Sequence, residues 1–194
     1  YPGFADITGP QLSEKMYQSA MKFGPEFKYG DVTSVDFSNK IKLVKTSDAE
    51  YEAKAVIIAT GAEHKHLGVP GEEEYSGRGV SYCAVCDAAF FKDEDVVVVG
   101  GGDSAIEEGL YLANIAKSVT VIHRRDSLRA QPVLQKRAFA NKKMNFIWNA
   151  QTEEISGDDQ KVTTVKYLDK KSGEHKEVSA SGIFIYVGVE PQTN

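Results

Sequence analysis

The feature that most constrains the fold is a glycine-rich turn that follows a strongly β-forming run. Residues 96–99 are four consecutive valines, and they lead directly into the three glycines of 100–102. An uninterrupted β-branched run is typical of a parallel strand that is buried on both faces. Apolar residues then recur at helical spacing over 103–116. A strand, a glycine turn and a helix in this order predict a strand–helix unit of a parallel α/β sheet.

The glycine turn has the spacing of a dinucleotide-binding site. Residues 100–105 read GGGDSA and fit the pattern G-x-G-x-x-A between a strand and a helix. Gly100 permits the tight turn, Gly102 lets a pyrophosphate approach the backbone, and Ala105 keeps helix and strand close. The free amides at the helix start face the phosphates. The alternative is a tight turn without a ligand. The residues predicted to bind nucleotide here are Gly100, Gly101, Gly102, Asp103, Ser104, Ala105 and Glu107.

The end of the next strand indicates which nucleotide binds. The strand expected over 119–123 ends in His123, and Arg124, Arg125 and Arg129 follow it. NAD-binding folds usually carry Asp or Glu at this point, where a carboxylate binds the ribose 2′-hydroxyl. Guanidinium groups instead bind a 2′-phosphate through charge-assisted, often bidentate hydrogen bonds. The pattern favours NADPH over NADH. The alternative is a solvated basic surface.

The only two cysteines of the sequence lie in one short motif. Cys83-Ala84-Val85-Cys86 is a C-x-x-C pair, and such thiols commonly exchange readily. Asp87 follows, and a carboxylic acid beside a dithiol can relay a proton when one sulfur leaves as a thiolate. We therefore predict a redox-active disulfide, with Cys83, Cys86 and Asp87 as the catalytic residues.

Three other interpretations of the cysteine pair stay open. A zinc site would need further ligands, and His64 and His66 are the candidates, although their spacing fits no zinc finger; we predict no metal. A static structural disulfide would close so short a loop that it adds little stability. A thioredoxin-fold active site would need a strand before the pair and a long helix after it, whereas this pair leads into the nucleotide strand.

Other elements are expected on both sides of these motifs. Thr8 and Gln11 are typical of a helix start, and the apolar spacing continues to Phe23. The Gly- and Glu-rich residues 68–79 are interpreted as a linker or surface loop. A period of two over 152–178 predicts a β-meander. Further strands are expected at 27–37, 41–46, 52–60, 145–148 and 182–187, and a further helix at 132–143.

The composition argues against two classes of function. A formal net charge of -5 disfavours non-specific nucleic-acid binding, which depends on an excess of Lys and Arg. The apolar runs are strand-sized, well short of the roughly 20 residues of a membrane-spanning helix. Because the sequence does not open with Met, we expect it to be a segment of a longer protein.

The two predicted sites together call for a third component. Nicotinamide delivers a hydride, whereas disulfide exchange proceeds through thiolates. A flavin is the usual converter between these two chemistries, so FAD or FMN is predicted.

The sequence resembles the low-molecular-weight, bacterial-type thioredoxin reductases, which are class II pyridine nucleotide-disulfide oxidoreductases. The segments that carry the resemblance are YPGF, ITGP, IIATGA, GVPGEEEYSGRGVSYCAVCD, VVVVGGGDSAIEEGLYL, HRRDSLRA and GIFIYVGVEPQTN. Flavoprotein reductases of alkyl hydroperoxide reductase share most of these segments. They resemble NADH enzymes, however, with an acidic residue where this chain has His123, Arg124 and Arg125.

The resemblance implies a function and residue roles. FAD passes electrons from NADPH to the disulfide, and the dithiol reduces thioredoxin. Cys83 attacks thioredoxin, Cys86 lies nearest the flavin, and Asp87 is the general acid. Ala88 stands where the family commonly has Gly. The protein would be a cytoplasmic homodimer. The alternatives are a peroxiredoxin-linked reductase that uses NADH and a nucleotide-binding module without activity.

The resemblance also implies a domain organisation. Residues 1–62 correspond to part of an α/β FAD-binding domain, 63–188 to a Rossmann-like NADPH-binding domain with a parallel sheet and a β-meander, and 189–194 to a return hinge. The two hinge strands would lie at 59–62 and 188–190. The other FAD-binding segments are expected before Tyr1 and after Asn194. The further cofactor-contact residues implied are Val187 and Gly188 for NADPH, and Val32, Ala59, Thr60 and Gly61 at the fringe of FAD.

Overall fold

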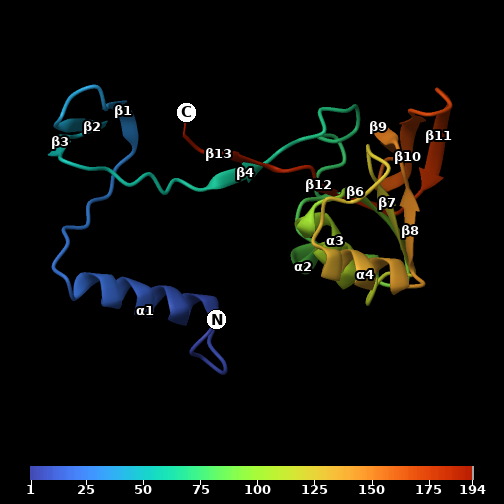
Figure 1. The fold of residues 1–194 in the computed structure, drawn as a ribbon, viewed down its shortest axis with the longest axis horizontal. Coiled ribbons are helices and arrows are strands. Elements are labelled where there is room, and N and C mark those ends of the chain that lie inside the picture. Colours follow the sequence, from blue (N-terminus) through green and yellow to red (C-terminus); the bar gives the residue numbers. More distant parts are fainter. Residues whose placement is uncertain (194) are drawn as a thin grey trace. The chain divides into compact units, whose positions relative to one another are not determined.

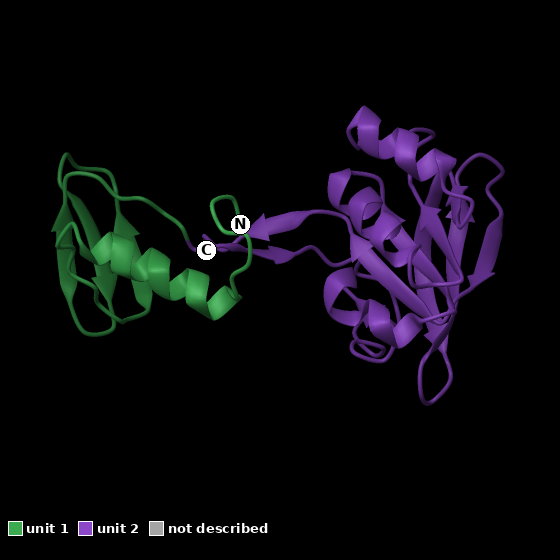
Figure 2. Ribbon diagram, turned by 90° about the horizontal axis from the view of Figure 1, so that it is seen from below, with its two compact units in different colours: residues 1–59 green, residues 60–194 purple. Residues whose placement is uncertain are grey.

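The computed structural model describes residues 1–193, so Asn194, the last residue of the predicted return hinge, lies outside the described residues. The chain divides into two compact units, Tyr1–Ala59 and Thr60–Asn194 (Figure 2). Within the described residues, no helix combines the length and the apolar character needed to cross a membrane.

The first unit contains one helix and a small antiparallel sheet. Helix α1 spans Gly9–Met21. Its start is a capping box, in which the Thr8 side chain accepts a hydrogen bond from the Gln11 backbone and the Gln11 side chain accepts one from the Thr8 backbone. This confirms the predicted helix start. The strands, in the order β1-β2-β3, are Val32–Asp36, Lys42–Thr46 and Glu50–Ala53.

Two predicted strands of this unit are wrong in extent. The strand expected over 27–37 begins only at Val32, and the one expected over 52–60 ends at Ala53. A strand is held by hydrogen bonds to a neighbouring strand. No described strand pairs with residues 54–59. Ile57, in the middle of the expected strand, is 93% exposed.

The second unit is built on a parallel sheet of five strands in the order β5-β12-β6-β7-β8 (Figure 1). All four neighbouring pairs are parallel. The α/β class and the parallel sheet predicted from the sequence are thus confirmed. The strands are β5 Val80–Ser81, β6 Asp95–Gly100, β7 Ser118–Ile122, β8 Met144–Ile147 and β12 Gly182–Tyr186.

Helices cover one face of this sheet, and an antiparallel β-meander covers the other. The helical segments are α2 Ala84–Asp87, the 3₁₀ helix η1 Ala88–Phe91, α3 Asp103–Leu112 and α4 Pro132–Ala140. The helices α3 and α4 end a few residues before the predicted ends, 116 and 143. The predicted meander consists of β9 Ala150–Gly157, β10 Val162–Asp169 and β11 His175–Ser179, in the order β11-β10-β9.

The valine run of β6 lies between two hydrophobic cores. Val96 and Val98 pack into the core on the helical side, and Val97 and Val99 into the core on the meander side. Successive side chains of a strand point to opposite faces, so a strand between two layers needs apolar residues at every position. This confirms the interpretation of 96–99 as a strand buried on both faces.

Residues 68–79 form turns without a helix or strand and are mostly exposed, as expected for a surface loop, but two of their side chains are buried. Tyr75 is buried in the core on the meander side, and the carboxylate-bearing Glu72 is only 4% exposed. One glycine is required by close packing: Gly71 has a positive φ of 85°, and a Cβ on it would overlap the backbone of Ile155. The polar composition of this segment gave no indication that Glu72 and Tyr75 are buried.

A two-stranded antiparallel ribbon ends the second unit. Strand β4, Ala62–His64, pairs with β13, Val189–Pro191. These strands lie within a few residues of the segments 59–62 and 188–190, for which two hinge strands were expected.

Candidate functional site

The glycine turn between β6 and α3 is shaped by its packing. Gly100 has a φ of +149°, and a Cβ on it would lie 2.5 Å from the carbonyl oxygen of Tyr186 and 2.8 Å from the Cβ of Ala105. Any larger residue would push β6 away from β12 and α3. Gly102, which caps α3, has no atom within 4 Å of the position of a Cβ. Protein atoms therefore pack closely against Gly100, whereas the space beside Gly102 is free of them. A bound pyrophosphate requires such a free space next to the backbone.

The middle glycine lies against a buried histidine. A Cβ on Gly101 would overlap the ring of His123. His123 is only 6% exposed, and its Nε2 atom has no hydrogen-bond partner within the described part of the chain. Burial lowers the pKa of His123, and the charges of Arg125 and Arg124 act in the same direction. The neutral ring therefore leaves an unsatisfied polar atom close to the glycine turn.

The loop after β7 is fastened to the glycine turn. The backbone N–H groups of Arg129 and Ala130 donate to the carbonyl oxygen of Gly101, at 2.7 and 3.1 Å. Gln131 donates to both carboxylate oxygens of Asp103, from its backbone at 2.7 Å and from its side chain at 3.1 Å. Asp103 thus holds the loop in place.

These contacts bring the predicted arginines next to the glycine turn. Arg124, Arg125 and Arg129 are all exposed. Over residues 1–193, none of the three forms an ion pair. Three guanidinium groups without carboxylate partners, at the end of β7, match the donor set that a 2′-phosphate would use. The residues therefore fit a bound NADPH.

The remaining predicted nucleotide residues lie at the same edge of the sheet. Ser104 and Glu107 are exposed on α3. Val187 and Gly188 follow β12, which is the neighbour of the strand that carries Gly100. Ligands of open α/β sheets bind outside the carboxyl ends of the strands, which is where these residues are.

The residues implied for the FAD fringe are divided between the two units. Val32 and Ala59 belong to the first unit, whereas Thr60 and Gly61 belong to the second. All four are exposed. The Thr60 hydroxyl donates to the carbonyl oxygen of Gln192. The described residues contain no second glycine fingerprint of the kind found at 100–105.

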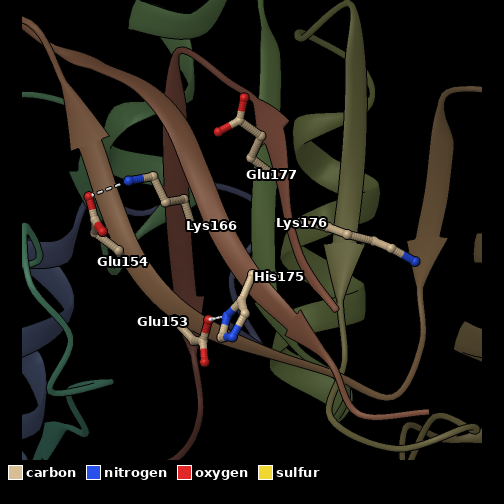
Figure 3. A pocket seen from close by; sticks show the side chains of 6 residues that line it. All are labelled: Glu153, Glu154, Lys166, His175, Lys176 and Glu177. Atoms are coloured by element: carbon tan, nitrogen blue, oxygen red, sulfur yellow. Dashed lines mark hydrogen bonds and ion pairs between the residues drawn. The ribbon is translucent and has the colours of Figure 1, made fainter. Parts of the chain in front are cut away.

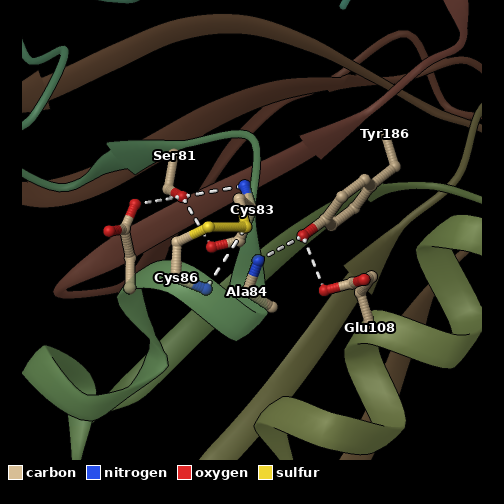
Figure 4. Close-up of a disulfide and its surroundings, with 7 residues drawn as sticks. Ser81, Cys83, Ala84, Cys86, Glu108 and Tyr186 are labelled. Carbon is tan, nitrogen blue, oxygen red and sulfur yellow. Dashed lines mark hydrogen bonds between the residues drawn. A yellow bond between two sulfur atoms is a disulfide. The ribbon is translucent and has the colours of Figure 1, made fainter. Parts of the chain in front are cut away.

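The predicted redox cysteines form a disulfide on helix α2 (Figure 4). Cys83 caps this helix, and Cys86 is exposed. The Ser81 hydroxyl accepts the backbone N–H of Cys83 at 3.1 Å and donates to the Asp87 carboxylate at 2.6 Å. Asp87 is therefore held close to the disulfide, where the sequence predicted an acid.

Tyr186 links the disulfide to the nucleotide strands and was missed by the sequence analysis. Its hydroxyl accepts the backbone N–H of Ala84 at 2.8 Å and donates to the Glu108 carboxylate at 3.4 Å (Figure 4). Burial raises the pKa of Tyr186, and the negative charge of Glu108 raises it further. The phenol stays protonated and can hold both partners. A tyrosine at the end of a buried strand was the only signal in the sequence.

A second network lies immediately before Cys83. The buried Glu72 carboxylate accepts hydrogen bonds from the Leu67 backbone at 3.0 Å, the Gly68 backbone at 2.7 Å and the Tyr82 hydroxyl at 2.8 Å. Burial acts to raise the pKa of Glu72, but these hydrogen bonds outweigh it, and the pKa is lowered. The Tyr82 hydroxyl is also 2.8 Å from Nδ1 of His66.

The histidines that were zinc candidates pack on this tyrosine. The ring of His64 stacks on Tyr82, with 5.7 Å between the ring centroids, and His66 meets it edge-on at 5.3 Å. Within residues 1–193, no three His, Cys, Asp or Glu side chains are grouped as metal ligands would be. The histidines thus attach the end of β4 to the residue before Cys83.

A hollow of about 410 Å³ lies on the β-meander (Figure 3). Its charged side chains mostly pair with one another: His175 is 2.7 Å from Glu153, and Lys166 is 2.9 Å from Glu154. Paired charges of alternating sign are typical of a solvated sheet face. Its lining includes none of the predicted site residues. The lining residues are Glu153, Glu154, Lys166, His175, Lys176 and Glu177.

Known proteins match nearly the whole of this chain. It is 56% identical to a thioredoxin reductase of Bacillus subtilis (strain 168) over 191 residues, which are 98% of this chain and 60% of that protein. It is also 56% identical over 193 residues to a thioredoxin reductase of Listeria innocua, with 100% of this chain and 60% of that protein covered. The chain thus spans about 60% of the length of these curated relatives.

Solved structures give the same result. The crystal structure of Lactococcus lactis thioredoxin reductase, in the FR conformation, matches with a TM-score of 0.83 at 52% identity. The match covers 98% of this chain and 63% of the Lactococcus lactis chain. A thioredoxin reductase of T. acidophilum matches with a TM-score of 0.80 at 39% identity, over 100% of this chain and 63% of that one. The profile described as "Pyridine nucleotide-disulphide oxidoreductase" matches residues 7–194. The family predicted from the sequence is therefore confirmed, and the chain belongs to the pyridine nucleotide-disulphide oxidoreductases.

Proposed function

We propose that this chain is the NADPH-binding and disulfide-bearing section of a flavin-dependent thioredoxin-disulfide reductase. The relatives named thioredoxin reductase, at 56% identity, support this activity. Because the chain spans about 60% of their length, the activity is proposed for the longer protein that contains it.

The observation that carries the proposal is that a single residue touches both predicted sites. Tyr186 pairs through its backbone with Gly100 of the glycine turn. Its hydroxyl holds the backbone of Ala84, between the two cysteines. Because the nucleotide site and the redox disulfide share a supporting residue, they belong to one connected part of the second unit, which supports a common role in electron transfer through FAD.

NADPH is the proposed reductant. The opening at Gly102 would admit the pyrophosphate. The guanidinium groups of Arg124 and Arg125, which form no ion pair within residues 1–193, would bind the 2′-phosphate. The aspartate or glutamate expected of an NAD site at the end of β7 is replaced by His123. FAD, when bound by the longer protein, would supply the two-electron exchange between the nicotinamide and the disulfide.

The cysteines would then reduce thioredoxin by two exchange steps. The Cys83 thiolate attacks one sulfur of the thioredoxin disulfide, and the other thioredoxin sulfur leaves and takes up a proton. The Cys86 thiolate attacks Cys83 in the resulting mixed disulfide, which releases the second thioredoxin thiol and restores the Cys83–Cys86 disulfide. Asp87, held by the hydroxyl of Ser81 at 2.6 Å, would supply the proton to a leaving sulfur.

The longer protein would have the organisation implied by the family. Residues 1–62 would contribute to an FAD-binding domain, with Val32, Ala59, Thr60 and Gly61 at the fringe of the flavin. Residues 63–188 would form the NADPH-binding domain, and the β4–β13 ribbon would be its hinge, with 189–194 leading back. We propose a homodimer that acts in the cytoplasm.

The test uses the full-length protein with NADPH and thioredoxin. We expect NADPH to be consumed, followed at 340 nm, only when thioredoxin is present. Replacing Cys86→Ser should abolish turnover while binding of 2′,5′-ADP, which carries the 2′-phosphate, stays unchanged. An intact flavoprotein that is inactive toward the thioredoxins of its source, or that reduces a peroxiredoxin partner faster with NADH, would refute the proposal.

A further inference from the structure

Three strands that are distant in sequence meet at the end of β7. Asn149, between β8 and β9, has a φ of +54°, a conformation that asparagine tolerates better than most residues. Its backbone N–H donates to the carbonyl oxygen of Arg125 at 3.0 Å, and its carbonyl oxygen accepts the backbone N–H of Lys170 at 2.8 Å. Asn149 thus ties the end of β10 to the arginine-bearing loop.

This arrangement places a further cation beside the arginines. The Nζ atom of Lys170 donates to the carbonyl oxygen of Arg124, at 3.5 Å. Lys170 is exposed, so its ammonium group is accessible at the carboxyl end of β7. In a parallel sheet this is the edge at which ligands bind.

The acidic groups around Lys170 do not neutralise it. Asp169, the preceding residue, binds Lys176 at 2.9 Å and accepts the backbone N–H groups of Lys171 and Ser172, at 3.0 and 3.3 Å. Across residues 1–193, Lys170 forms no ion pair.

The acidic group on the loop that carries the arginines does not neutralise these cations either. The one acidic residue there, Asp126, is exposed and accepts a hydrogen bond from the Ser127 hydroxyl at 3.2 Å. Positive charges gathered without partners repel one another, and an anion bound among them relieves that repulsion.

We propose that Lys170 is a further specificity-determining residue, which binds the 2′-phosphate of NADPH together with Arg124 and Arg125. This inference rests on the proposed function. A phosphate group has enough acceptor oxygens for two guanidinium groups and an ammonium group, and lysine binds phosphate as a point charge without a fixed orientation. The arginine pattern at the end of β7 can be found in the sequence, but Lys170 can be found only from the fold.

The test measures nucleotide binding to the full-length protein by calorimetry. The ligands are 2′,5′-ADP and 5′-AMP, which differ by the 2′-phosphate. Lys170→Gln should weaken the binding of 2′,5′-ADP by roughly 3- to 10-fold and leave 5′-AMP unchanged. Lys170→Arg should restore most of the loss. Unchanged binding of 5′-AMP also shows that the variant is folded.

Lys171→Gln is the matched control, because it removes the same charge from the adjacent exposed position. Within residues 1–193 its side chain forms no ion pair, and we expect less than about a 2-fold effect from it. An equal loss in both variants, or no loss in Lys170→Gln, would overturn the role of Lys170. If the parent protein itself binds 2′,5′-ADP no better than 5′-AMP, the NADPH assignment fails and the inference fails with it. If Arg124→Ala reduces that preference but Lys170→Gln does not, only the inference about Lys170 is refuted.

Discussion

The hydroxyl of Tyr82 donates a 2.8 Å hydrogen bond to the buried carboxylate of Glu72, and Tyr82 is the residue that precedes the first redox cysteine. The same carboxylate accepts the backbone N–H groups of Leu67 and Gly68, which follow strand β4 of the ribbon. One side chain therefore fixes both the exit from the ribbon and the approach to the disulfide.

This bond predicts a dependence of stability on pH. The folded-state pKa of Glu72 is lowered, so its contribution to the free energy of unfolding is complete above the unfolded pKa of about 4.3 and is lost as the pH falls toward the folded value. Glu72→Gln should lower stability at pH 7 and reduce the stability lost on acidification. The free energy of unfolding is measured with urea at pH 7 and at an acidic pH below the unfolded pKa of glutamate. The signal is the fluorescence of Trp148, the one tryptophan of the sequence. An acid-induced loss as large as in the parent would contradict the prediction.

Gly101 and Gly102 should respond differently to substitution by alanine. A Cβ on Gly101 would overlap the His123 ring, so Gly101→Ala should cost about 1–3 kcal/mol of stability. A Cβ on Gly102 meets no protein atom within 4 Å, so Gly102→Ala should change stability by less than about 0.5 kcal/mol.

Gly102→Ala should nevertheless weaken nucleotide binding, because its methyl group would occupy the space proposed for the pyrophosphate. Thermal unfolding and NADPH titration of the two variants separate these effects. A Gly102→Ala protein that binds NADPH as well as its parent would show that the pyrophosphate lies elsewhere.

The arginines should set the preference between coenzymes. Arg124→Ala combined with Arg125→Ala should remove about 1–3 kcal/mol of binding in favour of NADPH. NADH should be affected little, because it lacks the 2′-phosphate. The ratio of kcat/KM for the two coenzymes in the full-length protein measures the change, and a parent that prefers NADH would disprove the role of the arginines.

Tyr186 should support the disulfide helix through its hydroxyl. Tyr186→Phe keeps the ring but leaves the backbone N–H of Ala84, a buried residue, without its acceptor. The loss should cost about 1–3 kcal/mol of stability in the second unit. Urea unfolding followed by Trp148 fluorescence tests it, with Tyr111→Phe, on the outer side of α3, as the control. Equal effects of the two substitutions would argue against a specific role.

Some of this organisation follows from local patterns, and some depends on contacts between distant residues. The valine run 96–99 and the glycine turn after it were predictable, because burial on both faces and a tight turn each impose a residue type at fixed positions. The pairing of Lys170 with Arg124 was not, because the residues are separated by 46 positions and meet only through the fold. The prediction of a strand over residues 54–59 was wrong because a local pattern alone does not make a strand. The pattern of these residues suits one, but no described strand pairs with them.

The most direct test of the account is whether NADPH reduces the Cys83–Cys86 disulfide in the full-length protein. The protein is mixed with NADPH without oxygen, treated with an alkylating reagent, and examined by mass spectrometry of the peptide that holds both cysteines. We predict that both sulfurs become alkylated, as they do after chemical reduction. If this peptide stays unlabelled with NADPH but is labelled after chemical reduction, electrons do not pass from the nucleotide to the disulfide, and the proposed function is contradicted.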